Sequence, residues 1–196
     1  DEAAGLVLQV MDQEGLEKAV LLGHSMGGYI TLCFAEQFEA RLNGFGLIHS
    51  TAYADSEEKL VTRKRSVNFM KDHGVKLFME QLYPNLYGEK YTLAHHDEID
   101  KQIRASQVFQ PEELNQYYEM MMVRPDRTHV LKHAKAPVLF VVGTEDKTVI
   151  LTDSLAQCHL SLESHVHILE EAGHMGMKED PENTTAAIRA FMQYVN

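Results

Sequence analysis

Ser25 lies between glycines in the segment Gly23-His24-Ser25-Met26-Gly27, which follows an apolar run. A serine on a tight strand-to-helix turn can present its hydroxyl as a nucleophile, and the N-terminus of the following helix favours the negative charge of an acyl-transfer intermediate. We predict that Gly23 and Gly27 flank such a turn, because a Cβ atom would clash there. This pentapeptide arises often by chance, so it does not identify a nucleophile by itself. The prediction depends on whether a base and an acid follow elsewhere in the chain.

Asp146 and His174 are the candidate partners of Ser25. A serine hydroxyl is a weak nucleophile until an imidazole accepts its proton, and a carboxylate must hold that imidazole in one tautomer. Asp146 follows the apolar run APVLFVVG, and His174 follows the run HVHILE. Ligands of open α/β sheets meet the carboxyl ends of the strands, so we expect the three side chains to lie together at that edge. Glu145, next to Asp146, is the alternative acid.

Three neighbouring residues are expected to complete this site. The backbone N–H of Met26 would donate to the oxyanion, because it heads the helix that follows the nucleophile. His24, Met26 and Met175 flank the nucleophile and the base in the sequence. Methionine suits an adaptable apolar pocket, so we expect these three side chains to line the substrate pocket, with His24 at its rim.

Hydrophobic periodicity predicts the elements that position these residues. Continuous apolar runs indicate buried parallel strands, and apolar residues at helical spacing indicate amphipathic helices. The expected strands and helices alternate, which predicts a parallel sheet with helices on both faces. Strands are expected at 18–23, 45–50, 136–143 and 165–170, core helices at 3–11, 26–40, 152–160 and 180–195, and helices of a charged insertion at 57–82, 94–106 and 111–123.

Three motifs, GHSMGG, VVGTEDKTV and EEAGHM, resemble those of the α/β-hydrolase superfamily, in particular its compact serine esterase-like enzymes with a helical cap. The chain order Ser, Asp, His is also that of this fold. The resemblance implies an α/β fold that is the C-terminal part of a hydrolase core. Residues 1–51 and 134–196 would be its two core segments, and residues 52–133 an inserted all-helical cap.

The resemblance also implies that the N-terminal part of the family core is absent from this chain. That part supplies strands before 18–23 and the loop with a second oxyanion donor. The strand at 18–23 would then present an unpaired edge, which proteins avoid exposing. We therefore expect residues before Asp1 to cover this edge, or else a second chain, as in a homodimer.

The function implied by the resemblance is that of a serine hydrolase. It would cleave a small carboxylic ester or related acyl compound through an acyl-enzyme, without a cofactor or metal. Thioesterases, C–C bond hydrolases, lactonases and cofactor-free perhydrolases share these motifs, and the fold with its triad does not choose among them. The alternative from another class is a non-catalytic binding module of the hydrolase fold or an inactive fragment.

Composition narrows the partners of the chain. Its 196 residues carry a formal net charge of −11, which argues against nucleic acid and anionic membrane surfaces. No apolar run approaches ~18 residues, and we expect no signal peptide, so a cytoplasmic protein with a small-molecule acyl substrate is expected. Cys33 and Cys158 are interpreted as buried thiols of a reducing compartment.

Two other groups of residues allow different interpretations. His165 and His167 share one face of a strand and would suit a metal, but no third ligand has suitable spacing, so a structural role is favoured. Asp55 with Glu58 resembles a capping box. The basic residues that follow are interpreted as solvated helix surface: Lys59, Arg63, Lys64 and Arg65.

Overall fold

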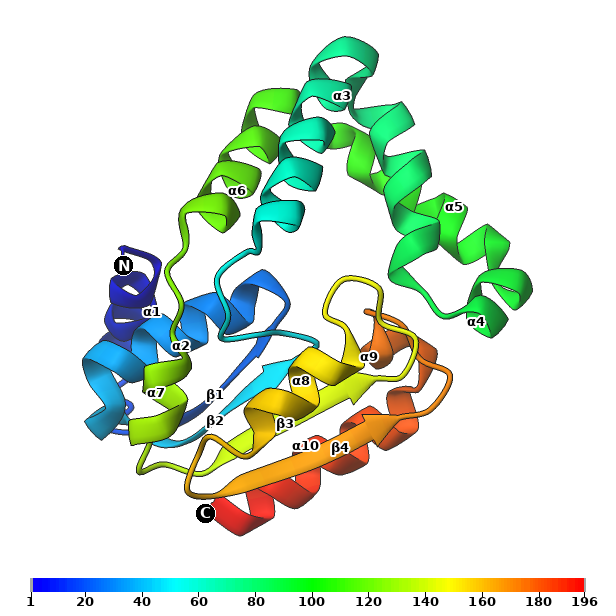
Figure 1. Cartoon of the computed structure of the whole chain (residues 1–196). Helices are drawn as coiled ribbons and strands as arrows, with labels where there is room; N and C mark the ends of the chain where they lie inside the picture. The colour runs from blue at the N-terminus through cyan, green and yellow to red at the C-terminus, as the bar shows by residue number, and fades with distance from the viewer. Residues whose placement is uncertain (1, 196) are drawn as a thin grey trace.

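The computed structural model describes residues 2–195, and its centre is a four-stranded parallel sheet (Figure 1). The strands lie in the order β1-β2-β3-β4, and among the described residues β1 pairs with β2 alone. All four predicted strands are confirmed, with bounds that shift by no more than three residues. The strands are β1 (Ala19–His24), β2 (Leu42–Ile48), β3 (Val138–Gly143) and β4 (Ser164–Leu169).

Helices cover both faces of the sheet, which confirms the predicted α/β class. Successive residues of β3 point to opposite faces: Phe140 packs in one apolar cluster, and Val141 packs in the other. The first cluster joins the sheet to α1 (Glu2–Gln13), α2 (Met26–Phe38), α7 (Thr128–His133) and α8 (Leu151–Cys158). The second joins it to α9 (Gly176–Glu179) and α10 (Pro181–Val195). As predicted for its N-terminus, α10 begins after Asp180, whose carboxylate accepts the Asn183 N–H at 3.1 Å.

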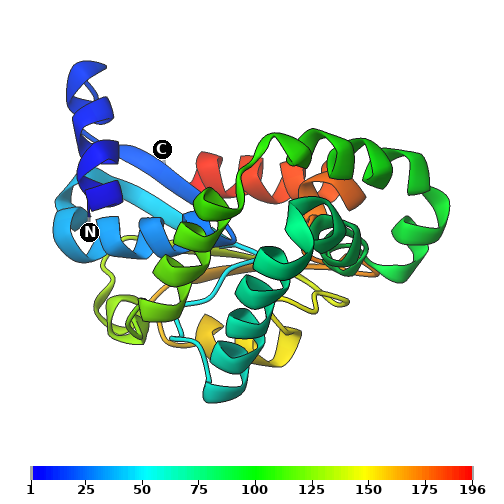
Figure 2. The same cartoon turned by 90° about the horizontal axis from the view of Figure 1, so that it is seen from above.

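The chain between β2 and α7 forms an arch of helices above the carboxyl ends of the strands (Figures 1 and 2). These helices bury an apolar cluster of their own, which includes Met70, Phe78 and Ile103. They are α3 (Glu57–Leu82), α4 (Glu89–Ala94), α5 (His96–Ala105) and α6 (Pro111–Val123). Gly74, at φ 82°, interrupts α3. Short 3-10 turns occupy Glu39–Arg41, Tyr83–Leu86 and Ser106–Val108. The division into parts at residues 51 and 133 stays a prediction.

The start of α3 differs from the prediction of a capping box at Asp55. Ser56 is the N-cap, because its hydroxyl accepts the Lys59 N–H at 3.2 Å. The Asp55 carboxylate is buried and instead pairs with two guanidinium groups, Arg63 at 2.5 Å and Arg124 at 2.9 Å. A buried carboxylate binds two guanidinium groups more strongly than it binds the backbone N–H groups at a helix terminus.

The basic residues of α3 correct a second expectation. Lys64 and Arg65 are exposed, as predicted, but Arg63 is buried and Lys59 is half-buried. Lys59 and Arg63 are four residues apart and therefore share one side of the helix. That side faces the interior of the molecule, where Arg63 meets Asp55.

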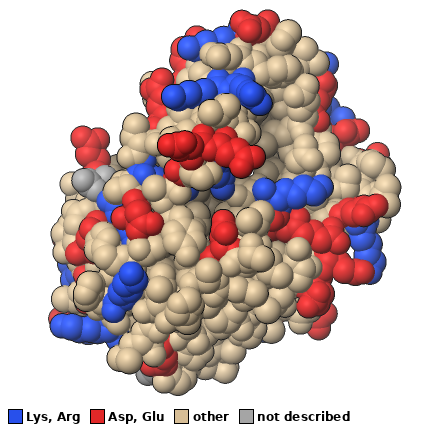
Figure 3. All heavy atoms as spheres, viewed as in Figure 1, with Lys and Arg blue, Asp and Glu red and all other residues tan. Residues whose placement is uncertain are grey.

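Charged side chains of both signs gather on the upper and outer parts of the face shown in Figure 3, whose lower middle is largely uncharged. None of the helices formed by residues 2–195 combines the length and the apolar character needed to cross a membrane. Cys33 is buried in α2, and Cys158 is half-buried at the end of α8; no disulfide joins these two elements.

Candidate active site

β1 passes into α2 through a sharp turn at Ser25. This residue adopts φ 52° and ψ −118°, in a region that non-glycine residues rarely occupy. Its N–H donates to the Ile48 carbonyl at 3.0 Å, which joins the turn to the end of β2. Strained backbone of this kind persists only where the surroundings enforce it, and here the turn presents the serine at the end of a strand.

Glycines make this turn possible, but one of them differs from the prediction. At Gly23 a Cβ atom would overlap the backbone of Gly27, and at Gly28 it would overlap the Ser50 side chain. At Gly27, by contrast, a Cβ atom would have no described heavy atom within 4 Å apart from its chain neighbours and the backbone of its own helix. The predicted clash at Gly27 is therefore wrong. Close packing requires Gly23 and Gly28, because β1 and the first turns of α2 touch at those residues.

Gly23→Ala and Gly27→Ala form a matched pair that tests this assignment. Gly23→Ala is expected to lower the free energy of unfolding by roughly 1–3 kcal/mol or more, because the added methyl meets backbone that cannot move aside. Gly27→Ala is expected to be neutral, or to stabilise by up to about 1 kcal/mol through its higher helix propensity. Urea unfolding followed by circular dichroism measures both, and equal losses in the two variants would contradict the assignment.

Ser25, Asp146 and His174 come together at one edge of the sheet. They follow β1, β3 and β4, whose carboxyl ends lie at the same edge of the parallel sheet (Figure 1). The Ser25 Oγ lies 2.8 Å from His174 Nε2, and His174 Nδ1 lies 2.8 Å from Asp146 Oδ2. The Ser25 hydroxyl can thus donate to His174, which donates through Nδ1 to the carboxylate. The side chains of Asp146 and His174 are almost wholly buried.

Of the two adjacent carboxylates, Asp146 is the one that meets the histidine. Its Oδ1 accepts the N–H groups of Thr148 at 2.7 Å and Val149 at 2.9 Å, while Oδ2 is left for the imidazole. Burial by itself would raise the pKa of Asp146, but hydrogen bonds from His174 and a second histidine hold that pKa well below its usual value. Glu145 points elsewhere and accepts the Glu89 N–H at 2.6 Å.

The second histidine is His49, to which no sequence motif pointed. Its Nδ1 lies 3.3 Å from Asp146 Oδ2, and its backbone has φ 47°. The ring is wholly buried, and its Nε2 has no hydrogen-bond partner among residues 2–195. His49 directly follows β2, the strand between those that carry Ser25 and Asp146. That position, at the carboxyl end of a predicted strand, is the sequence signal that would have found it.

The three residues His49, Asp146 and His174 are also the group of described residues whose ligand atoms lie close enough to hold a metal, within 4.8 Å of one another. His165 and His167 do not belong to this group. His165 Nε2 instead lies 3.2 Å from Glu163, and its ring packs on Phe191. The structural role favoured for His165 agrees with these contacts.

His24 lies against the imidazole of the triad. Its Nε2 donates to the His174 carbonyl at 2.8 Å, and the two ring centroids are 5.0 Å apart. Burial lowers the pKa of His24 from 6.5 to about 4, although the hydrogen bond to the carbonyl acts in the opposite direction. His24 is therefore neutral near pH 7 and adds no positive charge beside the His174 imidazole.

This lowered pKa predicts a pH dependence of stability. The unfolded chain binds a proton at His24 below about pH 6.5, but the folded chain binds it only below about pH 4. Between these values the unfolded state holds more protons, so the free energy of unfolding rises with pH, by up to about 1.4 kcal/mol per pH unit. His24→Gln keeps a donor for the His174 carbonyl but does not titrate. Urea unfolding at several pH values should show a shallower slope in that variant, and equal slopes would contradict the prediction.

Glu179 organises the loop that carries His174. Its carboxylate accepts the N–H groups of Gly173 and Met175, which flank the histidine, and that of Gly88 at 2.7 Å. The His174 N–H donates to the Leu86 carbonyl at 2.7 Å. The histidine loop is therefore joined to the arch by two contacts, from Glu179 to Gly88 and from His174 to Leu86. No sequence motif pointed to Glu179, because its partners are backbone groups.

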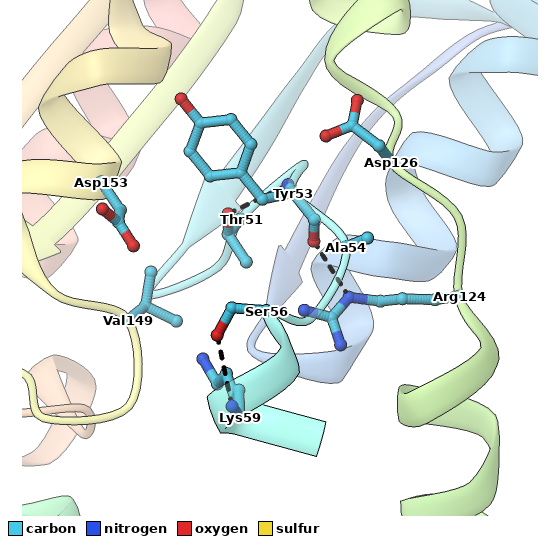
Figure 4. Close-up of a pocket in the computed structure, with 9 residues that line it drawn as sticks. All are labelled: Thr51, Tyr53, Ala54, Ser56, Lys59, Arg124, Asp126, Val149 and Asp153. Carbon is cyan, nitrogen blue, oxygen red and sulfur yellow. Dashed lines mark hydrogen bonds between the residues drawn. The ribbon is translucent and has the colours of Figure 1, made fainter. Parts of the chain in front are cut away.

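The predicted pocket residues occupy two places. Met26 begins α2 directly after Ser25, so its N–H stands at the N-terminus of that helix. Met175 packs against the apolar cluster of the arch. A pocket of about 380 Å³ lies between the core and the arch (Figure 4), and it is lined by other residues, among them Thr51 and Val149. Substrate contacts of His24, Met26 and Met175 stay a prediction.

Comparison with solved structures identifies the fold. A thermophilic esterase from Thermogutta terrifontis, solved with malate bound, is 30% identical with a TM-score of 0.86, over 95% of this chain and 69% of that one. The α/β hydrolase MGS-M2 from a Medee basin deep-sea metagenome library is 17% identical, with a TM-score of 0.88 over 97% of this chain and 70% of that one. The enol-lactonase from Burkholderia xenovorans LB400 is 21% identical, with a TM-score of 0.83 over 97% and 71%.

These likenesses confirm the α/β-hydrolase fold expected from the three motifs. None of the curated proteins compared with the chain matches it significantly. A family model, however, covers almost all of it: the model of the Ndr family, which has the α/β-hydrolase fold, matches residues 1–195. The chain therefore belongs to the Ndr family.

Proposed function

We propose that this protein is a serine hydrolase that cleaves a small carboxylic ester or a related acyl compound through an acyl-enzyme. The observation that carries the proposal is the unbroken relay from Ser25 Oγ through His174 to Asp146, with 2.8 Å at each step. Membership of the family and the fold do not decide the chemistry, which rests on the site.

The first half of the reaction follows from these contacts. Ser25 Oγ attacks the substrate carbonyl carbon while His174 Nε2 accepts the hydroxyl proton. The carbonyl oxygen becomes an oxyanion, and the Met26 N–H at the start of α2 donates to it. When the tetrahedral intermediate collapses, the bond to the leaving group breaks and His174 returns the proton to that group. The acyl group is then esterified to Ser25.

The second half repeats these steps with water. His174 accepts a proton from water, whose oxygen attacks the acyl carbon, and the acid leaves as Ser25 regains its proton. Throughout, the imidazolium is stabilised by Asp146, whose pKa lies below its usual value so that it stays ionised. His49, on the same carboxylate oxygen, helps to fix its orientation.

The proposed mechanism suits several related activities, which differ in the leaving group and in the bond that is cleaved. Thioester, lactone and C–C bond cleavage would use the same relay, and the solved neighbours include an enol-lactonase and a 2-hydroxy-6-oxo-6-phenylhexa-2,4-dienoate hydrolase. These neighbours are only 21% and 18% identical to this chain, so their substrates do not indicate the substrate of this protein. An ester of a small carboxylic acid is the simplest such substrate, because its cleavage needs only the groups described above.

Covalent labelling with a fluorophosphonate tests the proposal. We expect the purified chain to react at Ser25, identified by mass spectrometry of its peptides, because the probe requires a serine activated by a neighbouring base. Ser164→Ala, at the amino end of β4, is the control and should label normally. Folded wild-type protein that does not label at Ser25 would refute the hydrolase and favour the non-catalytic binding module.

A further inference from the structure

The pocket in Figure 4 is lined by residues that lie close in the sequence to His49 and Asp146. Thr51, two residues beyond His49, forms one wall, and Val149, whose N–H holds the Asp146 carboxylate, forms another. Lys59, at the start of α3, and Arg124, at the end of α6, close it from the arch. The pocket therefore lies at the carboxyl edge of the sheet, where open α/β folds bind their ligands.

Positive charge exceeds negative charge in the interior behind this pocket. Lys59, Arg63 and Arg124 all approach the same region, and Asp55 is the one carboxylate that pairs with them there among the described residues. Burial by itself would raise the pKa of Asp55, but both guanidinium groups hold it below its usual value. Buried charges are normally paired. Asp146 also acts on Lys59, but its carboxylate is engaged by His174 and His49, so positive charge remains for a further anion to balance.

Lys59 is the cation whose hydrogen-bond donors are least used inside the protein. Arg124 donates to the carbonyls of Tyr53 and Met121 and pairs with Asp55, so its hydrogen-bonding groups are largely used inside the protein. The Lys59 ammonium has three donors, and the hydrogen bond found for it goes to the Thr148 carbonyl at 2.7 Å. Burial lowers the pKa of Lys59, and the nearby Arg63 and Arg124 lower it further, while Asp55 and Asp146 act in the opposite direction.

Two acidic residues stand at the rim of the same pocket. Asp126 and Asp153 are both exposed, so water screens their carboxylates. Asp126 Oδ1 also accepts the N–H and hydroxyl of Thr128, which fixes it at the start of α7. Their charges therefore balance the buried cations less well than a ligand carboxylate inside the pocket would.

We propose that this pocket binds a carboxylate through Lys59, and that the carboxylate belongs to the acyl part of the substrate. The preferred substrates would then be half-esters of small dicarboxylic acids, with the ester carbonyl at Ser25 and the free carboxylate at Lys59. This assignment of substrate class rests on the proposed hydrolase function. The binding of a carboxylate at Lys59 does not, and it can be measured separately.

Two esters that differ in charge provide the test. Monomethyl glutarate carries the free carboxylate, and dimethyl glutarate replaces it with a neutral ester. A charge-assisted hydrogen bond predicts that kcat/KM for the half-ester exceeds that for the diester by roughly 10-fold or more. Titration of the released acid measures both rates. A wild-type protein that prefers the diester would overturn the proposal.

Lys59→Met and Lys64→Met assign the preference to one residue. Both remove an ammonium from α3, but Lys64 is exposed and lies outside the pocket. We expect Lys59→Met to lower the ratio of the two kcat/KM values by roughly 10-fold or more, and Lys64→Met to leave it unchanged. Circular dichroism and fluorophosphonate labelling of Ser25 establish that each variant is folded. An unchanged ratio in folded Lys59→Met would overturn the proposal.

Glutarate itself distinguishes a substrate subsite from a separate anion site. Competitive inhibition of dimethyl glutarate hydrolysis, weakened in Lys59→Met, would support the subsite. Lys59-dependent binding without competition would overturn the assignment to the acyl group. If wild-type protein hydrolyses neither ester, the hydrolase proposal fails by itself. Calorimetric titration with glutarate then decides the anion site: binding that requires Lys59 supports it, and the lack of binding refutes it.

Discussion

Ser25→Ala is expected to lower kcat for ester hydrolysis by roughly 10⁴-fold or more, the loss typical of a triad nucleophile. The hydroxyl forms a hydrogen bond to His174 Nε2. The turn that holds it is fixed by the Ser25 N–H and carbonyl, which pair with Ile48 and Ser50, and by closely packed glycines. The variant should therefore keep its fold. Steady-state hydrolysis of a small ester, with urea unfolding of the same preparations, measures the two properties separately.

Ser164→Ala provides the matched control for this prediction. Ser164 begins β4 at the opposite edge of the sheet, where its hydroxyl contacts Ser161. Its removal should leave kcat unchanged. A Ser25→Ala protein that retains a tenth of the wild-type activity would exclude Ser25 as the nucleophile, whatever the distances in the relay.

Asp146→Asn should also cost roughly 10⁴-fold in kcat, because an amide can donate to the imidazole and hold the wrong tautomer. In this chain the substitution also removes the negative charge that His49 faces and that stabilises the imidazolium of His174. The N–H groups of Thr148 and Val149 still find an acceptor in the asparagine carbonyl, so the loop should keep its shape.

Glu145→Gln is the control for the acid. Glu145 accepts a backbone N–H from Glu89, which a glutamine carbonyl also accepts, so kcat should change little. Measured kcat values for the two variants, with the same ester, decide between the adjacent carboxylates. A large loss in Glu145→Gln with little loss in Asp146→Asn would show that the acid was misassigned.

The helical arch shows where local pattern succeeds and where it fails. The predicted range 57–82 of α3 is the observed one, because helical periodicity and a polar start are local properties. Which basic residues of that helix are solvated was predicted wrongly for Lys59 and Arg63. The exposure of a helix face depends on what packs against it. Here Arg63 pairs with Asp55, and Lys59 donates to the Thr148 carbonyl, in the loop that follows Asp146.

The glycines of the elbow show the same limit. The sequence predicts a turn at Ser25, since an apolar run ends in glycines there. It does not tell which glycine lacks space. Gly23 and Gly28 are the crowded ones because a strand and a helix meet in three dimensions, while Gly27 faces open space.

By itself, the sequence determined the order of strands and helices and the placement of Ser25, Asp146 and His174 at strand ends. Both follow from local apolar patterning and from the rule that parallel strands end at one edge. Only the tertiary structure decided that His49 shares the Asp146 carboxylate, that Glu179 holds the histidine loop, and that Lys59 turns inward. These three depend on contacts between segments far apart in the chain, and such contacts leave no periodicity in the sequence.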